Sequence, residues 1–208
     1  MPTTKAAAKW SYDVHPSLAM YQSILAGMKE KTGRTLEEWC AFVQQQGPPT
    51  EEERRYWLRS SHGLGTNYAG WIAERSVGKG DDGDPATYLK KAPEYVDKMF
   101  AGPKAGLRPI YDALLTLAKK LGKDVRVCPC ETMVPLYRTH VFAQIQPSTR
   151  TRIDLGLALK NTKTPKRLID TGGFAKKDRI SRRIEISSPA DIDAEVQRWL
   201  KTAYEMDA

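Results

Sequence analysis

The chain has 208 residues, of which 40% are hydrophobic and 28% are charged, and its formal net charge at pH 7 is +8. This length allows one large domain or two small ones, with enough apolar side chains to bury a core. No stretch is apolar for long enough to be a membrane span or a secretory leader, so we expect a cytoplasmic protein that does not bind a membrane. The 3 cysteines follow no disulfide spacing and are expected to be reduced.

The positive charge is concentrated in the second half of the chain. Residues 1–100 carry 13 basic and 13 acidic side chains, whereas residues 101–208 carry 20 basic and 12 acidic ones. Between Arg138 and Arg183, 12 bases are opposed only by Asp154, Asp170 and Asp178. Such a basic surface favours an anionic partner, and nucleic acid, either DNA or RNA, is the common one. A solubilising surface without a ligand is the alternative interpretation.

Residues 1–77 are predicted to form an all-helical module. Apolar residues recur there at helical spacing in four segments. Gly33 is expected to end the first helix. Two of the others open with a capping box, in which a threonine and a glutamate three positions later satisfy each other's backbone N–H groups. The four helices are expected at about residues 17–32, 36–46, 51–61 and 66–77, and the boxes pair Thr35 with Glu38 and Thr50 with Glu53.

Residues 78–106 are predicted to be a linker that carries short helices. It opens with the hydrophilic, glycine-rich stretch "GKGDDGDP", which is typical of a boundary between domains. Two short helices are expected after it, at about residues 85–91 and 93–100.

Residues 107–208 are predicted to form a helix, an antiparallel sheet and a closing helix. After the amphipathic stretch "LRPIYDALLTLAKKLG" the apolar period drops to two, which indicates strands. The strands are joined by short turns such as "QPSTRT", which cannot host the crossovers of a parallel sheet. Ser188 and Pro189 are expected to begin the closing helix. The fold class is therefore expected to be α+β.

The side chains of two arginine pairs are expected to lie on defined faces of these strands. Arg150 and Arg152 stand two apart and should project from one face. Arg182 has the same parity as Ile184 and Ile186, so it either lies beyond the edge of the core or precedes the strand.

The stretch "SHGLGTNYAGWIAERS" resembles the core of the helix–hairpin–helix motif. Gly63, Leu64 and Gly65 are followed at the motif's spacing by Ala69 and Ile72. The glycines allow a tight turn, and we expect a positive φ at Gly65. The resemblance implies a clamp that grips the phosphates of nucleic acid with the N–H groups and positive dipole end of the next helix.

Two features leave the phosphate clamp open at this point. The motif often carries a basic residue at the second position after the second glycine, where this chain has Asn67. A glycine turn that serves only helix packing is the alternative. His62, just before the turn, is interpreted either as a cap of the preceding helix or as a phosphate contact.

Longer stretches of the chain resemble two families. "KTGRTLEEWCAFVQQQG" with "RYWLRSSHGLGTNYAGWIAER" is similar to the bacterial domain of unknown function 4287. The segment that contains "FAQIQPSTRTRIDLGL" is similar to domain of unknown function 5655. These resemblances imply no catalytic or binding residues. The strand pattern and the closing helix also resemble double-wing proteins with a frataxin-like fold, which implies that fold by analogy alone.

These patterns predict a non-enzymatic nucleic-acid-binding protein that contacts the phosphate backbone without sequence specificity. The alternative is a protein-interaction or small-ligand-binding module, and an unrecognised enzyme is a third interpretation, although no catalytic constellation or phosphate loop occurs. No cofactor is expected, and Cys128 and Cys130 are interpreted as buried thiols rather than as zinc ligands. The predicted nucleic-acid contacts are Gly63, Gly65, Thr66, Asn67, Arg138, Arg150, Arg152, Lys176 and Lys177.

Overall fold

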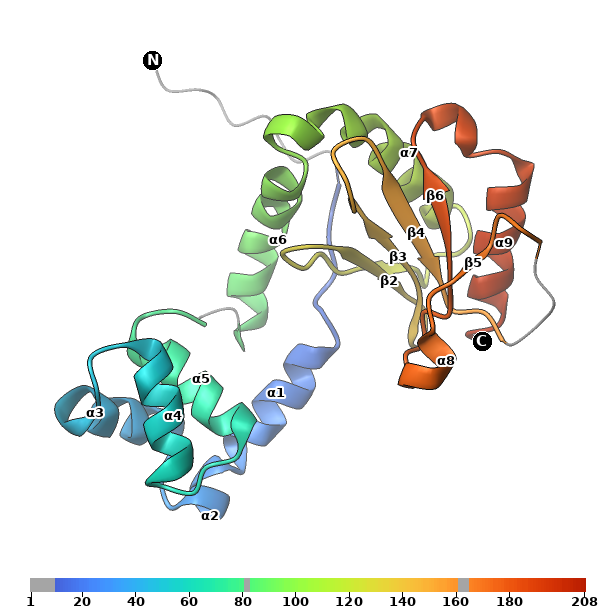
Figure 1. Cartoon of the computed structure of the whole chain (residues 1–208). Coiled ribbons are helices and arrows are strands. Elements are labelled where there is room, and N and C mark those ends of the chain that lie inside the picture. The colour runs from blue at the N-terminus through green and yellow to red at the C-terminus, as the bar shows by residue number, and fades with distance from the viewer. Residues whose placement is uncertain (1–9, 81–82, 161–164) are drawn as a thin grey trace. The chain divides into compact units, whose positions relative to one another are not determined.

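The structure is a computed structural model that describes residues 10–80, 83–160 and 165–208 (Figure 1). It divides into two compact units. Val14–Tyr88 forms a helical unit, and Leu89–Ala208 forms an α+β unit together with the described residues 10–13. The predicted fold class is confirmed: helices come first, followed by a helix, a six-stranded antiparallel sheet and a C-terminal helix.

Among the described residues, the helical unit contains the α-helices α1 to α5 before α6. Both predicted capping boxes are confirmed, because each threonine accepts from the backbone of its glutamate and each glutamate accepts in return. Gly33 ends its helix in the left-handed conformation, with φ at 81°. The first predicted helix is wrong in one respect, because it is divided at Gly27. The bounds are α1 (Ser17–Ala26), α2 (Met28–Thr32), α3 (Leu36–Gln46), α4 (Glu51–Ser60) and α5 (Thr66–Ser76).

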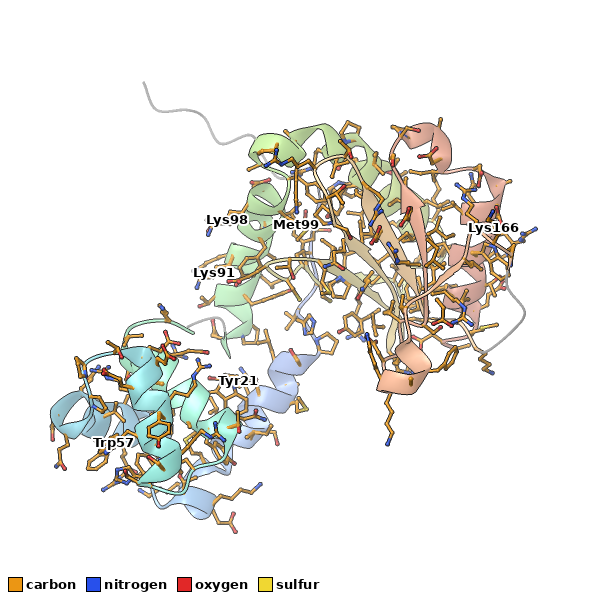
Figure 2. All side chains as sticks on the ribbon, in the orientation of Figure 1. Tyr21, Trp57, Lys91, Lys98, Met99 and Lys166 are labelled. Carbon is orange, nitrogen blue, oxygen red and sulfur yellow. The ribbon has the colours of Figure 1, made fainter. Side chains whose placement is uncertain are left out.

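The helical unit has its own hydrophobic core, to which α2, α3, α4 and α5 contribute. Leu58 of α4 and Ile72 of α5 are fully buried there. Ala69 is also fully buried, which accounts for a small residue at that position, since the α4–α5 pair packs closely. Trp57, labelled in Figure 2, packs against this core from its edge.

The α+β unit is a sheet whose strand order is β1-β2-β3-β4-β6-β5, with every pair antiparallel as predicted. Helices α7 and α9 share one core with it. The strands are β1 (Arg126–Val127), β2 (Val134–Tyr137), β3 (Val141–Gln146), β4 (Ile153–Leu157), β5 (Ile169–Asp170) and β6 (Arg182–Ile186). The helices are α6 (Pro85–Met99), the 3-10 helix η2 (Gly102–Leu107), α7 (Arg108–Lys119), α8 (Gly173–Lys176), the 3-10 helix η3 (Pro189–Asp191) and α9 (Ala194–Glu205).

Two local predictions from residue 85 onward are wrong. The two short helices expected around residues 85–100 are one continuous helix, α6, with Pro93 inside it. Ser188 opens the short helix η3 rather than the closing helix, because its capping partner is Asp191. The closing helix α9 begins later, and its N-cap is Asp193, which accepts from the backbone of Val196. Helix α8 was not predicted.

Two faces of the sheet differ in character. Leu155 of β4 pairs with Ile145 of β3 and Ile184 of β6, and all three are fully buried in the shared core. On the other face, Asp154 pairs with Glu185, and this face carries polar side chains. Arg182, whose place relative to Ile184 and Ile186 was left open from the sequence, lies within β6 on the same face as these two residues. Its side chain is 7% exposed and forms an ion pair with Asp170 at 2.9 Å.

Residues 10–13 belong to the α+β unit, although they precede the helical one. The backbone N–H of Asp13 donates to the carbonyl of Val127 at 2.8 Å, and the Val127 N–H donates back to the Asp13 carboxylate. Trp10 donates its indole N–H to Asp112 of α7 at 2.8 Å. The chain therefore leaves the α+β unit before the helical unit and enters it again through α6.

Candidate nucleic-acid interface

The turn between α4 and α5 holds the two glycines in different conformations. Gly63 has a φ of +64°, whereas Gly65 is extended, with φ at −63° and ψ at 158°. The expected positive φ at Gly65 is therefore wrong, and the left-handed residue is Gly63. Between them the side chain of Leu64 is buried, and its N–H donates to Leu58 at 3.1 Å. Burying that side chain fixes the turn against α4, and Gly63 reverses the chain before it.

The beginning of α5 is open to solvent. Gly65 is its N-cap and offers no side-chain hydrogen bond. A Cβ atom at Gly65 would meet nothing within 4 Å. Thr66 and Asn67 are exposed. Since the first N–H groups of a helix have no partner inside it, α5 presents free donors and its positive dipole end at this surface.

A cavity of about 400 Å³ lies beside this turn in the helical unit. Arg59 lines it and forms no ion pair within the part of the chain that the structure describes, unlike Arg55, which bonds Glu51 and Glu74. Tyr56 also lines it and is 74% exposed. The cavity thus combines a free cation, an exposed aromatic ring and the start of a helix. Its lining residues are Tyr56, Arg59, Ser60, Leu64, Gly65 and Thr66.

His62 has neither of the roles considered from the sequence. Its ring lies among Trp39, Phe42 and Trp57, with ring-centroid separations of 5.6, 5.2 and 4.4 Å respectively. The C-terminus of α4 is instead capped by the backbone N–H of Ser61. His62 directly precedes Gly63, so the packing of its ring against these aromatic side chains holds the start of the turn in place.

Two of the predicted basic contacts are neutralised by carboxylates. Arg138 follows β2, bonds Asp124 at 2.8 Å and lies over the ring of Tyr204. The hydrogen bond from Tyr204, followed in size of effect by that from Arg138, lowers the pKa of Asp124. This carboxylate therefore stays charged. Arg152 lies 2.9 Å from Asp154 on the polar face of the sheet. Arginines held in such pairs contribute little positive field.

The polar face of the sheet carries a balanced ion network. Arg152 also bonds Glu185 at 2.9 Å, and Arg183 bonds the same two carboxylates at 2.7 and 3.0 Å. Two guanidinium groups thus meet two carboxylates. The excess of bases in this segment is therefore partly cancelled inside the fold, because carboxylates outside the segment, such as Asp124 and Glu185, pair with its arginines.

Three predicted contacts carry a charge without an ion pair among the described residues. Lys176 and Lys177 are exposed on α8 and just after it, and Lys177 has a φ of 55°. Arg150 is exposed in the β3–β4 connection, where it lines a groove together with Lys98 and Lys104. Lys98 and Lys104 were missed from the sequence, because they come from α6 and η2, which were interpreted as linker. The predicted residues thus belong to different units, the turn residues to the helical unit and the basic ones to the α+β unit.

The cysteines show no metal-binding arrangement. In the described ranges, no three His, Cys, Asp or Glu side chains are grouped so that they could hold a metal ion. Cys128 is buried, and burial raises the pKa of its thiol to about 12. Burial also raises the pKa of Cys130. No helix among the described residues has the length and apolar character that crossing a bilayer requires.

Comparison with known proteins agrees with the resemblances seen in the sequence. Residues 20–75 match the family described as Domain of unknown function (DUF4287), and residues 96–207 match Domain of unknown function (DUF5655). The first match covers the turn between α4 and α5, and the second covers the sheet with α7 and α9. Neither the curated proteins nor the solved structures contain a match. The chain therefore belongs to the DUF5655 family and carries a DUF4287 domain before it.

Proposed function

We propose that the chain binds the phosphate backbone of nucleic acid, without sequence specificity and without catalysis, through the turn between α4 and α5. The observation that carries this proposal is the free cation Arg59 beside the uncapped start of α5. A phosphate oxygen is the acceptor that such a start binds best, because backbone N–H donors and the dipole act together.

Each group at the turn has a part in this proposal. The N–H groups of the first turn of α5, beginning at Thr66, donate to phosphate oxygens. Arg59 supplies the positive charge, because the position at which the motif often carries a basic residue is the neutral Asn67 in this chain. Tyr56 offers a ring on which an unpaired base or a sugar can pack. Contacts of this kind reach the backbone and not the base edges, so they carry no sequence information.

The basic residues of the α+β unit would add weaker contacts. Lys176 and Lys177 are exposed and have no carboxylate partner in the described ranges, so they can attract a polyanion at long range. Arg138 and Arg152 contribute less, because Asp124 and Asp154 hold them. We therefore expect the affinity to depend on the helical unit first.

A pair of charge-removing variants tests the proposal. Arg59→Gln should lower the affinity for a fluorescently labelled oligonucleotide at low salt about threefold or more, measured by anisotropy. Lys31→Gln is the matched control, since Lys31 is exposed in the same unit, forms no ion pair among the described residues and does not line the turn cavity. Equal losses in the two variants would mean that only net charge matters, and the turn would not be the binding site.

A second candidate function is small-ligand binding in the helical unit. Between α1 and α5 lies a mostly apolar pocket of about 300 Å³, whose lining includes Leu18, Tyr21, Ile24 and Trp71. The rings of Tyr21 and Trp71 meet edge to face at 4.8 Å. A pocket of this size suits a small apolar molecule. Indole titrated into the protein should shift the Trp71 indole N–H signal in an NMR spectrum if this candidate is right.

A further inference from the structure

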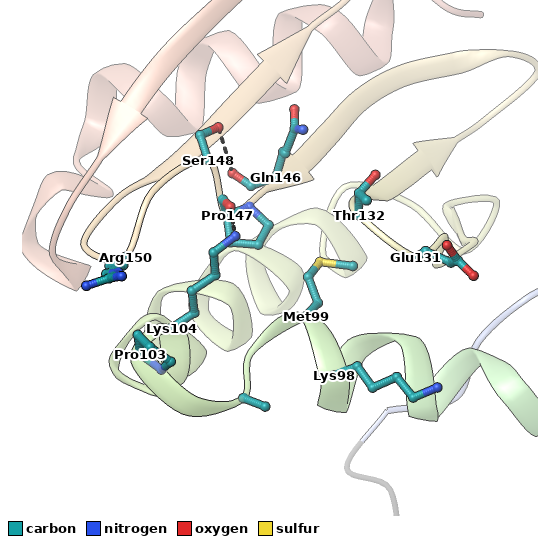
Figure 3. A pocket seen from close by; sticks show the side chains of 11 residues that line it. Lys98, Met99, Pro103, Lys104, Glu131, Thr132, Gln146, Pro147, Ser148 and Arg150 are labelled. Atoms are coloured by element: carbon teal, nitrogen blue, oxygen red, sulfur yellow. Dashed lines mark hydrogen bonds between the residues drawn. The ribbon is translucent and has the colours of Figure 1, made fainter.

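A groove of about 520 Å³ lies in the α+β unit, between the end of α6 with η2 and the β3–β4 hairpin (Figure 3). Its volume lies within the range of pockets that bind small organic molecules. All of its lining residues belong to the α+β unit, so it is separate from the turn to which nucleic-acid binding was assigned above.

The first feature of the groove is a half-buried ammonium group without a counter-ion. Lys104 of η2 donates from Nζ to the carbonyl oxygen of Pro147 at 2.7 Å. That bond fixes the ammonium at the hairpin and uses one of its three donors. No carboxylate pairs with Lys104 in the described part of the chain. A partly desolvated charge in this position is stabilised by an anion, which would also accept the remaining donors.

Two further cations line the groove, Lys98 of α6 and Arg150 of the hairpin. Both are exposed, and neither forms an ion pair among the described residues. Arg138 and Arg152, by contrast, are bonded to carboxylates elsewhere in the unit. The groove is therefore a place where the fold leaves positive charges unneutralised, with one carboxylate, Glu131, against three cations.

The two sides of the groove differ in chemistry. Figure 3 shows Arg150 and Lys104 on one side and Glu131 with Thr132 on the other. A carboxylate repels a phosphate but accepts hydrogen bonds from hydroxyl groups. A ligand with an anionic end and a hydroxylated end therefore fits the groove in one orientation.

Part of the groove's lining is apolar, and none of the lining residues is aromatic. Met99, Pro103 and Pro147 contribute to its lining. Stacking of a flat base needs an aromatic or guanidinium plane. Among the lining residues only Arg150 offers one, and a guanidinium that binds the anionic end of a ligand is not free to stack on a base. The organic part of the ligand is therefore expected to be an aliphatic or sugar-like group rather than a base.

From these features we infer that the groove binds a phosphate monoester carried by a hydroxylated, sugar-like group. The phosphate lies against Lys104 and Arg150, and the hydroxyl groups lie toward Glu131 and Thr132. Such a group occurs in a free sugar phosphate and at the 5′-phosphorylated end of a nucleic-acid strand, which share this chemistry.

Binding to the whole chain tests the inference, by calorimetry at low salt. The probes are ribose 5-phosphate, ribose, inorganic phosphate and a short oligonucleotide with and without a 5′-phosphate. Ribose 5-phosphate should bind more tightly than either ribose or inorganic phosphate. If the 5′-phosphorylated oligonucleotide exceeds both ribose 5-phosphate and its unphosphorylated form at least tenfold, the source of the phosphate is a strand end; otherwise it is a free sugar phosphate.

Variants locate the binding in the groove. The double variant Lys104→Gln with Arg150→Gln keeps a donor for Pro147, removes two charges and should weaken ribose 5-phosphate binding at least tenfold. Lys123→Gln removes an exposed charge of the same unit that does not line the groove, and it should leave the binding unchanged. Lys98→Gln, at an exposed side chain, should weaken it about threefold and gives a second reading if the double variant folds poorly.

Two results would overturn the inference. One is that ribose 5-phosphate binds no more tightly than inorganic phosphate and a 5′-phosphate adds nothing to the affinity of the oligonucleotide, and the other is that the groove variants bind ribose 5-phosphate as tightly as Lys123→Gln. Arg59→Gln should leave ribose 5-phosphate binding unchanged, so the groove and the α4–α5 turn can fail independently.

Discussion

The carboxylate of Asp207 accepts a hydrogen bond from the backbone N–H of His140 at 2.7 Å, and its other oxygen lies 3.1 Å from Nδ1 of the same residue. The Asp207 side chain is 2% exposed, and Arg179 donates to it at 2.7 Å. This contact joins the residues after α9 to the β2–β3 connection and to the segment before β6. The buried carboxylate of Asp207 thus links three segments of the α+β unit by hydrogen bonds.

Asp207→Asn should destabilise the α+β unit. The variant removes the charge that Arg179 and His140 face, and it leaves buried polar groups with poorer partners. The expected loss is about 1–3 kcal/mol in the free energy of unfolding, measured by urea titration. Glu205→Gln is the control, because that side chain is 59% exposed and, within residues 10–80, 83–160 and 165–208, forms an ion pair with Lys201 alone. Equal stability of the two variants would show that Asp207 does not fasten the unit.

Replacement by alanine should lower the stability of the protein at Gly63 but not at Gly65. Gly63→Ala places a Cβ on a left-handed residue and should cost about 1 kcal/mol of unfolding free energy. Gly65→Ala should be nearly neutral in stability, since its φ is −63° and a Cβ there meets nothing within 4 Å. Thermal melts of both variants check this. A larger loss at Gly65 than at Gly63 would contradict the observed geometry.

Removing Asp170 alone should cost more unfolding free energy than removing Asp170 and Arg182 together. The Arg182 side chain is 7% exposed, whereas that of Asp170 is 60% exposed. Asp170→Asn leaves a buried guanidinium without its carboxylate and should destabilise the protein by about 1–3 kcal/mol. Arg182→Met in the Asp170→Asn background should restore part of that loss, because it removes the unpaired charge. Urea unfolding of the single and double variants measures the recovery, and a further loss would be the contrary result.

Cys128 should be protected from thiol reagents in the folded chain. Burial raises the pKa of its thiol to about 12, so almost none is thiolate at pH 8. Because the folded state holds this proton more tightly than the unfolded state does, stability should fall as pH rises from about 9 towards 12. Ellman's reagent applied with and without urea measures the protection. Equal rates in the two conditions would contradict it.

The helical unit could be predicted largely from local signals. The pairs Thr35 with Glu38 and Thr50 with Glu53 are three residues apart, so their bonds are decided within one helical turn. The spacing of apolar residues, which changes from a period of 3.6 to a period of two after Gly122, likewise predicted the strands of the sheet. Segment 81–82, inside the predicted glycine-rich break, lies outside the described residues.

What the sequence could not reveal depends on contacts between distant residues. The bond between Asp13 and Val127 joins positions that no local pattern links, so the place of residues 10–13 was missed. Arg152 looked available for a phosphate because its pairing with Asp154 and Glu185 depends on the register of β4 with β6. The groove was missed for the same reason, since Lys104 and Arg150 meet only through the fold.

The salt dependence of oligonucleotide binding by the wild-type chain and by Asn67→Lys tests the proposed function most directly. Asn67 is exposed on the first turn of α5, so a lysine there adds a cation where a bound phosphate would lie. We expect the wild-type affinity to fall steeply with salt, and the variant to bind more tightly with a log–log slope steeper by about 0.7–0.9. Binding that ignores salt, or a variant with the wild-type affinity and slope, would contradict phosphate contact at the turn.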